Sequence, residues 1–173
     1  MIYLQDLLLD IKSLKVGTRL HISGVLYTAR DAAHKRIINI LDNKKHLPFQ
    51  LNNAAIYYCG PTPVNKNGLC ACGPTTSARM DLFTPRILSE GVKFLIGKGA
   101  RSDTVVNIIH KMSAVYFIAT GGIAALLSTT IKRIDLIAFK DLGPEAIYRL
   151  EIYNMPLIVA IDSFGNNIFN KKR

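Results

Sequence analysis

Apolar residues along this chain fall into short runs, which glycine, proline and polar residues separate. Residues 19–28 are largely apolar, with Gly24 in the middle, and predict a strand or a bent pair of strands. Residues 32–41 carry Ala33, Ile37 and Leu41 at helical spacing, and Asp31 stands where a helix N-cap belongs. We expect a loop at 43–48, a short strand at 54–58 and a turn region at 59–68.

The second half of the chain alternates strand-like and helix-like segments. A helix with Pro85 in its first turn and Gly91 after its end precedes a strand at 93–96, a loop at 97–99 and a helix at 103–110. The pattern then predicts a strand at 114–119, a short helix at 123–127, a strand at 134–139, a helix near 145–153 and a strand at 157–161. Successive units of this kind predict an α/β fold with a mixed sheet in a single domain.

Residues 112–131 are uncharged over a length that could span a bilayer. Their interior favours another interpretation, because an aromatic and β-branched run at 114–119 is followed by a Thr-Gly-Gly turn at 120–122. A strand, a turn and a short helix are therefore expected here, without a membrane span.

Length and composition favour one folded domain in a reducing compartment. Of the 173 residues, 49% are hydrophobic and 20% are charged, which excludes disordered and low-complexity classes. Three cysteines are an odd number, which does not suit a disulfide-stapled secreted domain. Residues 1–11 contain aspartates and no basic start, so they make a poor signal peptide, and we expect a cytoplasmic protein.

Residues 73–81 are a first candidate for binding an anion. Thr75, Thr76 and Ser77 follow a Gly-Pro turn and precede a helical segment, where unpaired amides, hydroxyls and the helix dipole attract negative charge. Arg79 lies four residues after Thr75 and can offer its guanidinium to a carboxylate or phosphate on the same helix face. An ordinary helix cap beside a surface arginine explains the same residues.

A second candidate, at residues 28–36, lies where a strand is expected to give way to a helix. Arg30 could hold an anion. Asp31 could orient Arg30 or the imidazole of His34, which would then titrate near neutral pH. A capping Asp31 followed by an exposed basic helix face is the alternative.

A third candidate surrounds Lys98, between Gly97 and Gly99. The segment lacks the spacing of a P-loop and has Ser102 where a dinucleotide fingerprint needs Gly or Ala, so a nucleotide site is not expected. What remains is a lysine on a flexible loop that can approach a ligand closely, or a simple turn.

The cysteines and the net charge leave several classes open. Cys59, Cys70 and Cys72 could supply thiolates to an iron–sulfur cluster, but their spacing matches no known pattern, and buried free cysteines are expected instead. The formal charge of +10 admits a nucleic-acid partner. An anionic substrate together with an acidic partner subunit explains the charge equally well.

Six segments together resemble one family, in order and along nearly the whole chain. They are TARDAAHKR (28–36), CGPTTSARMD (72–81), IGKGARS (96–102), ATGGIAALL (119–127), DLGPEAI (141–147) and PLIVAIDSFGN (156–166). They resemble the β subunit of the class I iron–sulfur fumarate hydratases and L-tartrate dehydratases, which is the C-terminal domain of single-chain members. The resemblance implies that residues 1–173 form one β-type domain of swivelling β/β/α architecture.

The resemblance also implies a chemistry and its partners. The family hydrates fumarate reversibly to (S)-malate, a tricarboxylic acid cycle step, at a [4Fe-4S] cluster whose cysteines belong to an α subunit. The three cysteines of this chain are then structural or incidental, and the chain holds no metal. The expected partners are that iron–sulfur α subunit and a small dicarboxylate, in an α2β2 heterotetramer with a β–β contact, without nucleic acid or membrane. A non-catalytic module that binds an anion or nucleic acid is the competing class.

Motif position implies individual roles. Arg30 resembles a carboxylate-binding arginine, Lys98 resembles the lysine of a Gly-Lys-Gly loop, and the loop that grips the substrate comprises Thr75, Thr76, Ser77, Ala78 and Arg79. Thr75 is expected to face the transferred proton, and because a threonine hydroxyl is a weak base, Asp31 and His34 are its expected catalytic support. ARDAAH at 29–34 and Arg-Ser at 101–102 resemble the fumarate branch, so fumarate is favoured over L-tartrate and mesaconate.

Overall fold

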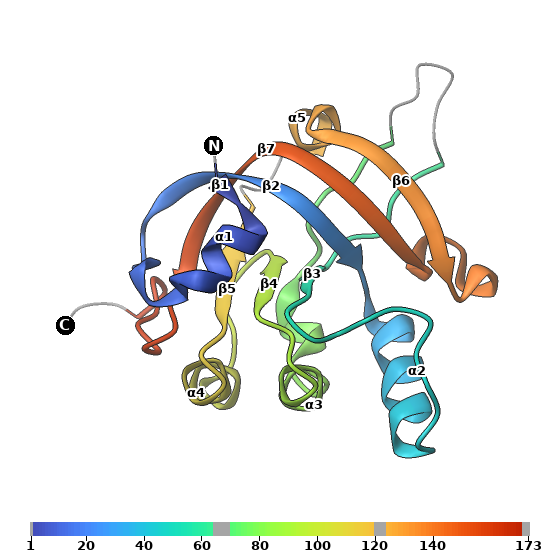
Figure 1. The fold of residues 1–173 in the computed structure, drawn as a ribbon, viewed down its shortest axis with the longest axis horizontal. Coiled ribbons are helices and arrows are strands. Elements are labelled where there is room, and N and C mark those ends of the chain that lie inside the picture. The colour runs from blue at the N-terminus through green and yellow to red at the C-terminus, as the bar shows by residue number, and fades with distance from the viewer. Residues whose placement is uncertain (1, 64–69, 120–123, 171–173) are drawn as a thin grey trace.

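The sheet of this protein closes on itself because the last strand in sequence pairs with other strands along both of its edges. The computed structural model describes residues 2–63, 70–119 and 124–170 (Figure 1). Within them the strands run in the order β1-β2-β3-β4-β5-β7-β6, with a further pairing between β2 and β7. The strands are β1 (Ile2–Tyr3), β2 (Arg19–Thr28), β3 (Ala55–Tyr57), β4 (Phe94–Gly97), β5 (Val115–Ile118), β6 (Ile131–Ala138) and β7 (Ile147–Ile161).

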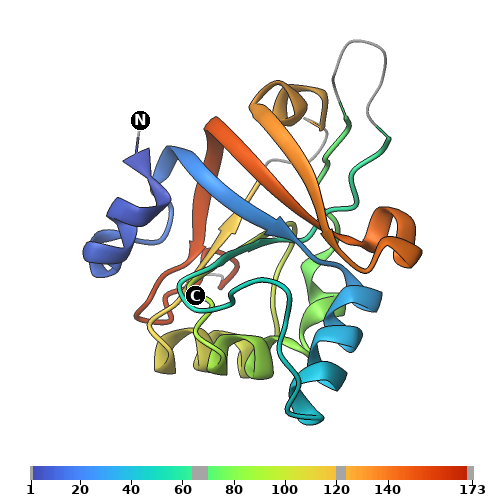
Figure 2. The same cartoon turned by 45° about the vertical axis from the view of Figure 1, so that its right-hand side comes forward.

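Helices connect and cover the strands. They are α1 (Leu4–Leu9), α2 (Asp31–Asp42), α3 (Thr84–Ser89), α4 (Asp103–Lys111) and α5 (Ala124–Thr129), with short 3₁₀ helices at Ile11–Ser13, Ser77–Met80 and Lys140–Glu145. Figures 1 and 2 both show α2, α3 and α4 gathered on one side of the parallel strands, while β2, β7 and β6 arch over the opposite side. The predicted α/β fold with a mixed sheet is confirmed.

Strand direction divides the sheet into two parts. β2, β3, β4 and β5 are parallel to one another, and β7 is antiparallel to both β2 and β5. At Ile158 the closure is direct, because this residue pairs with Arg19 of β2 and with Ile118 of β5. The register of β2 shifts between Ile22 and Gly24, where the glycine has a φ of +134°. The interruption predicted at Gly24 is therefore a bulge that bends one continuous strand.

Alternate residues of the strands feed two separate cores. On β3, β4 and β5, Tyr57, Phe94 and Phe117 pack inside the closed sheet. Their strand neighbours Leu95 and Tyr116 belong to the second core, which lies between the sheet and the helices. Strands that are buried on both faces read as continuous apolar runs, which is why these segments were recognisable from the sequence.

Two sequence-based predictions are wrong. The helix expected near 145–153 is part of β7, in which Leu150 and Ile152 are buried while Glu151 and Tyr153 are exposed. This is the two-residue period of a strand. The residue in the N-cap position of α2 is Arg30, and Asp31 is the first residue of the helix.

The apolar segment at 112–131 contains β5 and α5, as expected, although the turn at 120–122 lies outside the described residues. Residues 64–68 of the predicted turn region also lie outside them. In the part of the chain that the structure describes, every helix is too short or too polar to cross a membrane.

Candidate functional site

The predicted site residues meet at the carboxyl ends of neighbouring parallel strands. Arg30 follows β2, Tyr58 follows β3, and Lys98 follows β4. Parallel strands in both barrels and open sheets bind ligands at this edge, because the loops that leave the strands converge there. The hydroxyl-rich segment is attached to the same edge, since the backbone amide and the hydroxyl of Thr75 both donate to the Tyr58 carbonyl at 2.7 Å. Thr76 and Lys98 form an isolated parallel bridge.

Arg30 is held from one side and remains unsatisfied on another. Its Nη2 lies 3.2 Å from Oε1 of Glu145, and the same carboxylate accepts the Ala32 amide at the start of α2. The buried Nε of Arg30 has no hydrogen-bond partner within the described residues. A Cβ added to Gly60 would come within 3.0 Å of the Arg30 guanidinium, so glycine leaves room there for this side chain. The Arg30 side chain is 23% exposed, so its guanidinium can still bind an anionic ligand.

Asp31 pairs with Arg79 across the two candidate segments. Its Oδ2 lies 3.0 Å from Nη2 of Arg79, and both side chains are substantially exposed. The structure thus brings the segments together, but the predicted partners of Asp31 were Arg30 and His34. Because Arg79 extends outward on a 3₁₀ turn at the surface, it remains accessible to a ligand.

His34 is a fully buried, neutral residue, which corrects the prediction that it titrates near neutral pH. Burial lowers its pKa from 6.5 to about 4. Its Nδ1 lies 2.8 Å from the Arg30 carbonyl, and since a carbonyl only accepts, Nδ1 carries the proton. The His34 backbone amide donates to the same oxygen. The imidazole therefore fixes the backbone of Arg30, while its buried Nε2 is unpaired within the described residues.

The loop at residues 75–79 contains side chains in different environments. Thr75 is partly buried, Thr76, Ala78 and Arg79 are exposed, and Ser77 is completely buried. The helical segment that follows Thr76 is a 3₁₀ helix without a side-chain cap. The Ser77 hydroxyl accepts the Lys98 amide at 2.9 Å and lies 2.9 Å from the Tyr116 hydroxyl. Ser77 thus faces the protein interior, Thr75 bonds the Tyr58 carbonyl, and Thr76 is exposed.

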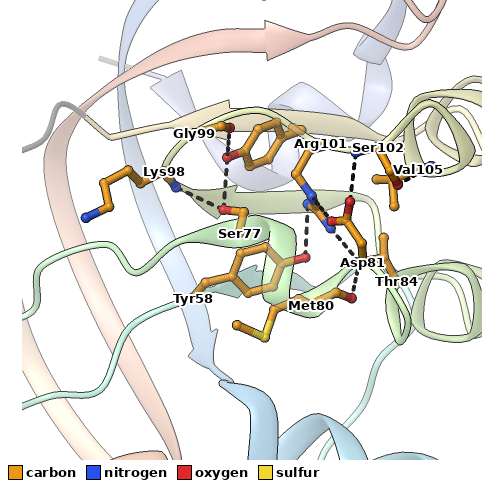
Figure 3. Close-up of polar contacts among 11 residues, drawn as sticks. Tyr58, Ser77, Met80, Asp81, Thr84, Lys98, Gly99, Arg101, Ser102 and Val105 are labelled. Carbon is orange, nitrogen blue, oxygen red and sulfur yellow. Dashed lines mark hydrogen bonds and ion pairs between the residues drawn. The ribbon is translucent and has the colours of Figure 1, made fainter.

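Lys98 projects from a tightly packed loop. Its side chain is exposed and points away from the buried polar contacts beneath it (Figure 3). Its carbonyl accepts the Ser77 amide at 3.0 Å. A Cβ on the preceding Gly97 would lie 2.0 Å from Ser77 Oγ and 2.8 Å from the Tyr58 ring, so only glycine permits this approach. The backbone of Lys98 is therefore held in place, while its side chain extends into solvent.

Beneath these residues lies a buried ion pair that the sequence did not reveal. The Arg101 side chain has no exposed surface, and its Nε donates to Asp81 Oδ1 at 2.6 Å. Asp81 also accepts the Ser102 amide at the start of α4 (Figure 3). Arg101 further donates to Thr84 at 2.6 Å and lies over the Tyr58 ring. The ion pair thus joins the 75–81 segment to the helix that follows the lysine loop.

In the sequence Arg101 is part of the IGKGARS segment, and nothing near it indicates that Asp81 and two tyrosine rings surround it. The acidic residue that ends the CGPTTSARMD segment was the one available signal for its partner.

The three cysteines are buried free thiols, as predicted. Burial raises the pKa of Cys59 well above its ordinary value and that of Cys70 to about 12. A hydrogen bond from Cys59 lowers the pKa of Cys72, whose sulfur lies 3.9 Å from that of Cys70. Within the described residues, no group of three His, Cys, Asp or Glu side chains could hold a metal ion.

Comparisons with known proteins agree on one family. The family model described as fumarase C-terminus matches residues 2–172. A Methanocaldococcus jannaschii protein, provisionally named L(+)-tartrate dehydratase subunit beta, is 44% identical over 94% of this chain and 89% of its own length. L(+)-tartrate dehydratase subunit beta of Escherichia coli K12 is 36% identical over 94% of this chain and 84% of its own length.

Longer proteins match as well. Fumarate hydratase 1, mitochondrial, of Leishmania major is 36% identical over 96% of this chain, which covers 31% of that protein. The chain therefore spans most of the two beta subunits and about a third of the fumarate hydratase.

Replacing Asp81 by Asn should destabilise the fold, because it leaves the Arg101 charge buried without its partner. We expect a loss of about 3 kcal/mol in the free energy of unfolding, measured by urea titration. Asp135→Asn is the matched control, since its partners Arg133 and Arg149 both reach solvent, and it should cost less than about 1 kcal/mol. Equal losses in the two variants would contradict the structural role of the buried pair.

Acid should destabilise the protein through His34. Between pH 6.5 and about 4 the unfolded chain protonates this imidazole while the folded chain keeps it neutral, so the free energy of unfolding falls as pH falls. The shift corresponds to about 3 kcal/mol across this window. Urea titrations at several pH values should show a shallower dependence in His34→Asn, whose amide can still donate to the Arg30 carbonyl. His21→Asn, at an exposed site on β2, should keep the wild-type slope.

Proposed function

Because this chain belongs to the fumarase C-terminus family, we propose that it is the β-type subunit of a hydro-lyase that acts on a small dicarboxylate. In this proposal it contributes carboxylate-binding side chains to a site that an α subunit completes. Two relatives that match most of the length of this chain are named as beta subunits, and this supports the existence of such a partner.

The observation that carries the proposal is that the segments of three cations are joined at one edge of the sheet. Arg30, Arg79 and Lys98 come from separate segments, and the bonds of Thr75 to Tyr58, of Thr76 to Lys98 and of Asp31 to Arg79 tie those segments to one sheet edge. A dicarboxylate needs a cationic partner at each end, and guanidinium groups can bind carboxylates through two parallel hydrogen bonds. This composition fits a doubly charged acid better than a neutral ligand.

These cations would act most strongly as the reaction proceeds. Removing the proton next to a carboxylate delocalises negative charge onto that carboxylate, and a fixed cation stabilises it as it develops. Arg30 is fixed by Glu145 and by the bonds of His34 to its carbonyl. It is therefore preorganised, so that little rearrangement is needed when the charge appears.

Thr75 is the proposed contact of the transferred proton. Its hydroxyl hydrogen is directed to the Tyr58 carbonyl, which turns the oxygen lone pairs away from the backbone. Asp31 and His34 were predicted to support proton transfer by Thr75, but their contacts suggest a different role. Asp31 binds Arg79 and His34 binds the Arg30 carbonyl, so both would act by positioning the cations.

Exposure of the site supports a second protein surface. Thr76, Arg79 and Lys98 are exposed in this chain, whereas small-molecule sites bury most of the ligand surface. We propose that an α subunit covers this edge, in an α2β2 assembly with a β–β contact. The formal charge of +10 favours an acidic covering surface.

The iron–sulfur cluster of the family is assigned in this proposal to the α subunit. The thiols of this chain do not fit it, because Cys59, Cys70 and Cys72 are all buried, and a cluster held by them would need space inside the packed core. Their contacts are with one another and with the core inside the closed sheet.

Fumarate, hydrated to (S)-malate, is the proposed substrate, on the strength of the ARDAAH segment and the Arg-Ser pair after the glycine loop. L-tartrate is the second candidate. It is favoured by the relatives of similar length, both of which carry the name of a tartrate dehydratase beta subunit.

The complex of this chain with a cysteine-bearing α-type partner from the same genome should hydrate fumarate under anaerobic conditions. Loss of the ultraviolet absorbance of fumarate measures the reaction, and this chain alone should be nearly inactive. Turnover of L-tartrate but not fumarate would select the second candidate. If no such partner binds and the chain instead binds DNA or RNA with steep salt dependence, the hydro-lyase proposal fails.

Single substitutions in the complex should separate the roles of the site residues. Thr75→Ala should lower kcat by roughly 100-fold, as expected for loss of a proton-transfer group. Arg30→Ala and Arg79→Ala should each raise KM and lower kcat, with kcat/KM falling by at least about tenfold, because they bind the substrate and the developing charge.

Arg86→Ala is the control for these variants, since Arg86 forms surface ion pairs on α3 with Asp42 and Glu90. It should keep kcat and KM within about twofold of wild type. A Thr75→Ala enzyme with kcat within a few-fold of wild type would remove the proton-transfer role.

A further inference from the structure

Tyr116 of β5 is a buried group that the proposed chemistry does not use, and its hydroxyl reaches the lysine loop from below. It lies 2.9 Å from Ser77 Oγ and 2.8 Å from the Gly99 carbonyl, and the whole residue is buried. We propose that Tyr116 and Ser77 are positioning residues that lock the Gly97–Gly99 loop and thereby aim Lys98 at the substrate. This inference rests on the proposed function of Lys98 as a carboxylate-binding residue.

The donors and acceptors of this group fix the direction of every bond. The Lys98 amide can only donate, so Ser77 Oγ accepts from it at 2.9 Å. The Gly99 carbonyl can only accept, so the single proton of the Tyr116 hydroxyl goes to it. The remaining Ser77 proton then points to the Tyr116 oxygen. One directed chain thus starts at Lys98, passes through both hydroxyls and ends at Gly99.

These hydrogen bonds hold the backbone on both sides of the Lys98 Cα. On one side the Ser77 hydroxyl accepts the Lys98 amide, and on the other the Tyr116 hydroxyl donates to the Gly99 carbonyl. A second bond, from the Ser77 amide to the Lys98 carbonyl at 3.0 Å, closes a small ring between the two segments. Gly99 has a φ of +84°, a conformation that an unbound loop would leave easily because glycine has many others. The hydroxyls therefore supply the restraint that the glycines lack.

The hydroxyl of Ser77 is fully committed in this arrangement. It accepts one bond and donates another, and the residue has no exposed surface. Its assignment as a direct substrate contact is thereby replaced by a role that acts through Lys98. Tyr116 belongs to β5, which pairs with β4 along its length, and its ring is packed in the core between the sheet and the helices, so the lock is anchored in the core.

A double-mutant cycle in the assembled enzyme tests the proposal with fumarate and, should fumarate not react, L-tartrate. Tyr116→Phe should lower kcat/KM by about tenfold when Lys98 is present. In a Lys98→Ala background the same change should alter kcat/KM by less than twofold, because the residue through which it acts is absent. Equal losses in both backgrounds would overturn the proposal, since a general effect on folding does not depend on Lys98.

Amide hydrogen exchange of this chain gives a readout that needs no activity. In Tyr116→Phe the Lys98 amide should exchange at least about tenfold faster than in wild type, while that of Leu95 in β4 stays protected. Tyr57→Phe is the matched control, because it removes the hydroxyl of an equally buried tyrosine that bonds the Cys72 carbonyl instead. It should leave Lys98 exchange unchanged.

The two measurements distinguish the possible failures. An assembled enzyme without activity on either acid refutes the proposed function, and the exchange of Lys98 still decides whether the lock exists. Unchanged Lys98 exchange in Tyr116→Phe overturns the lock, whatever the enzyme does.

Discussion

The double pairing of β7 is the constraint on which the rest of the structure depends. Because β7 bonds β2 along one side and β5 along the other, the parallel strands between them are forced into a closed surface. Closure brings the carboxyl ends of β2, β3 and β4 around one edge, and the cations come from the loops that leave those ends. Every interaction described at the site, from the Thr75 bonds to the buried ion pair, presupposes this curvature.

Most of the fold was predictable because its strands are short, apolar and separated by glycine or proline. β7 was the exception, since its first half carries Arg149, Glu151 and Tyr153 on one face and looks amphipathic. The pairings of β7 with β6 and β2 decide in favour of a strand, and no local propensity contains that information. Tertiary pairing therefore overrode the helix expected near 145–153.

The candidate site also contains residues that could be predicted from the sequence and residues that could not. Arg30, Thr75 and Lys98 were proposed from the sequence because each lies in a polar segment next to an expected strand or turn. Their supports were not, because Glu145 lies far along the chain from Arg30 and Arg101 is buried by tyrosines from two other segments. His34 was misjudged for a related reason, since a histidine in a basic sequence gives no sign that Tyr58 and Phe83 will enclose it. Candidate ligand-binding residues can be proposed from local patterns, whereas the residues that hold them in place are determined by the fold.

The closure by β7 also has a consequence for how the chain acquires its structure. Arg19 and Ile158 come from opposite ends of the sequence, so the ring cannot form until β7 has left the ribosome. Until then, β2 and β5 present unpaired edges, which are the surfaces through which partly folded chains associate. Contacts of such high sequence separation also slow the search for the native topology. Biogenesis of this protein therefore depends on keeping the nascent chain apart from its neighbours until its last strand arrives.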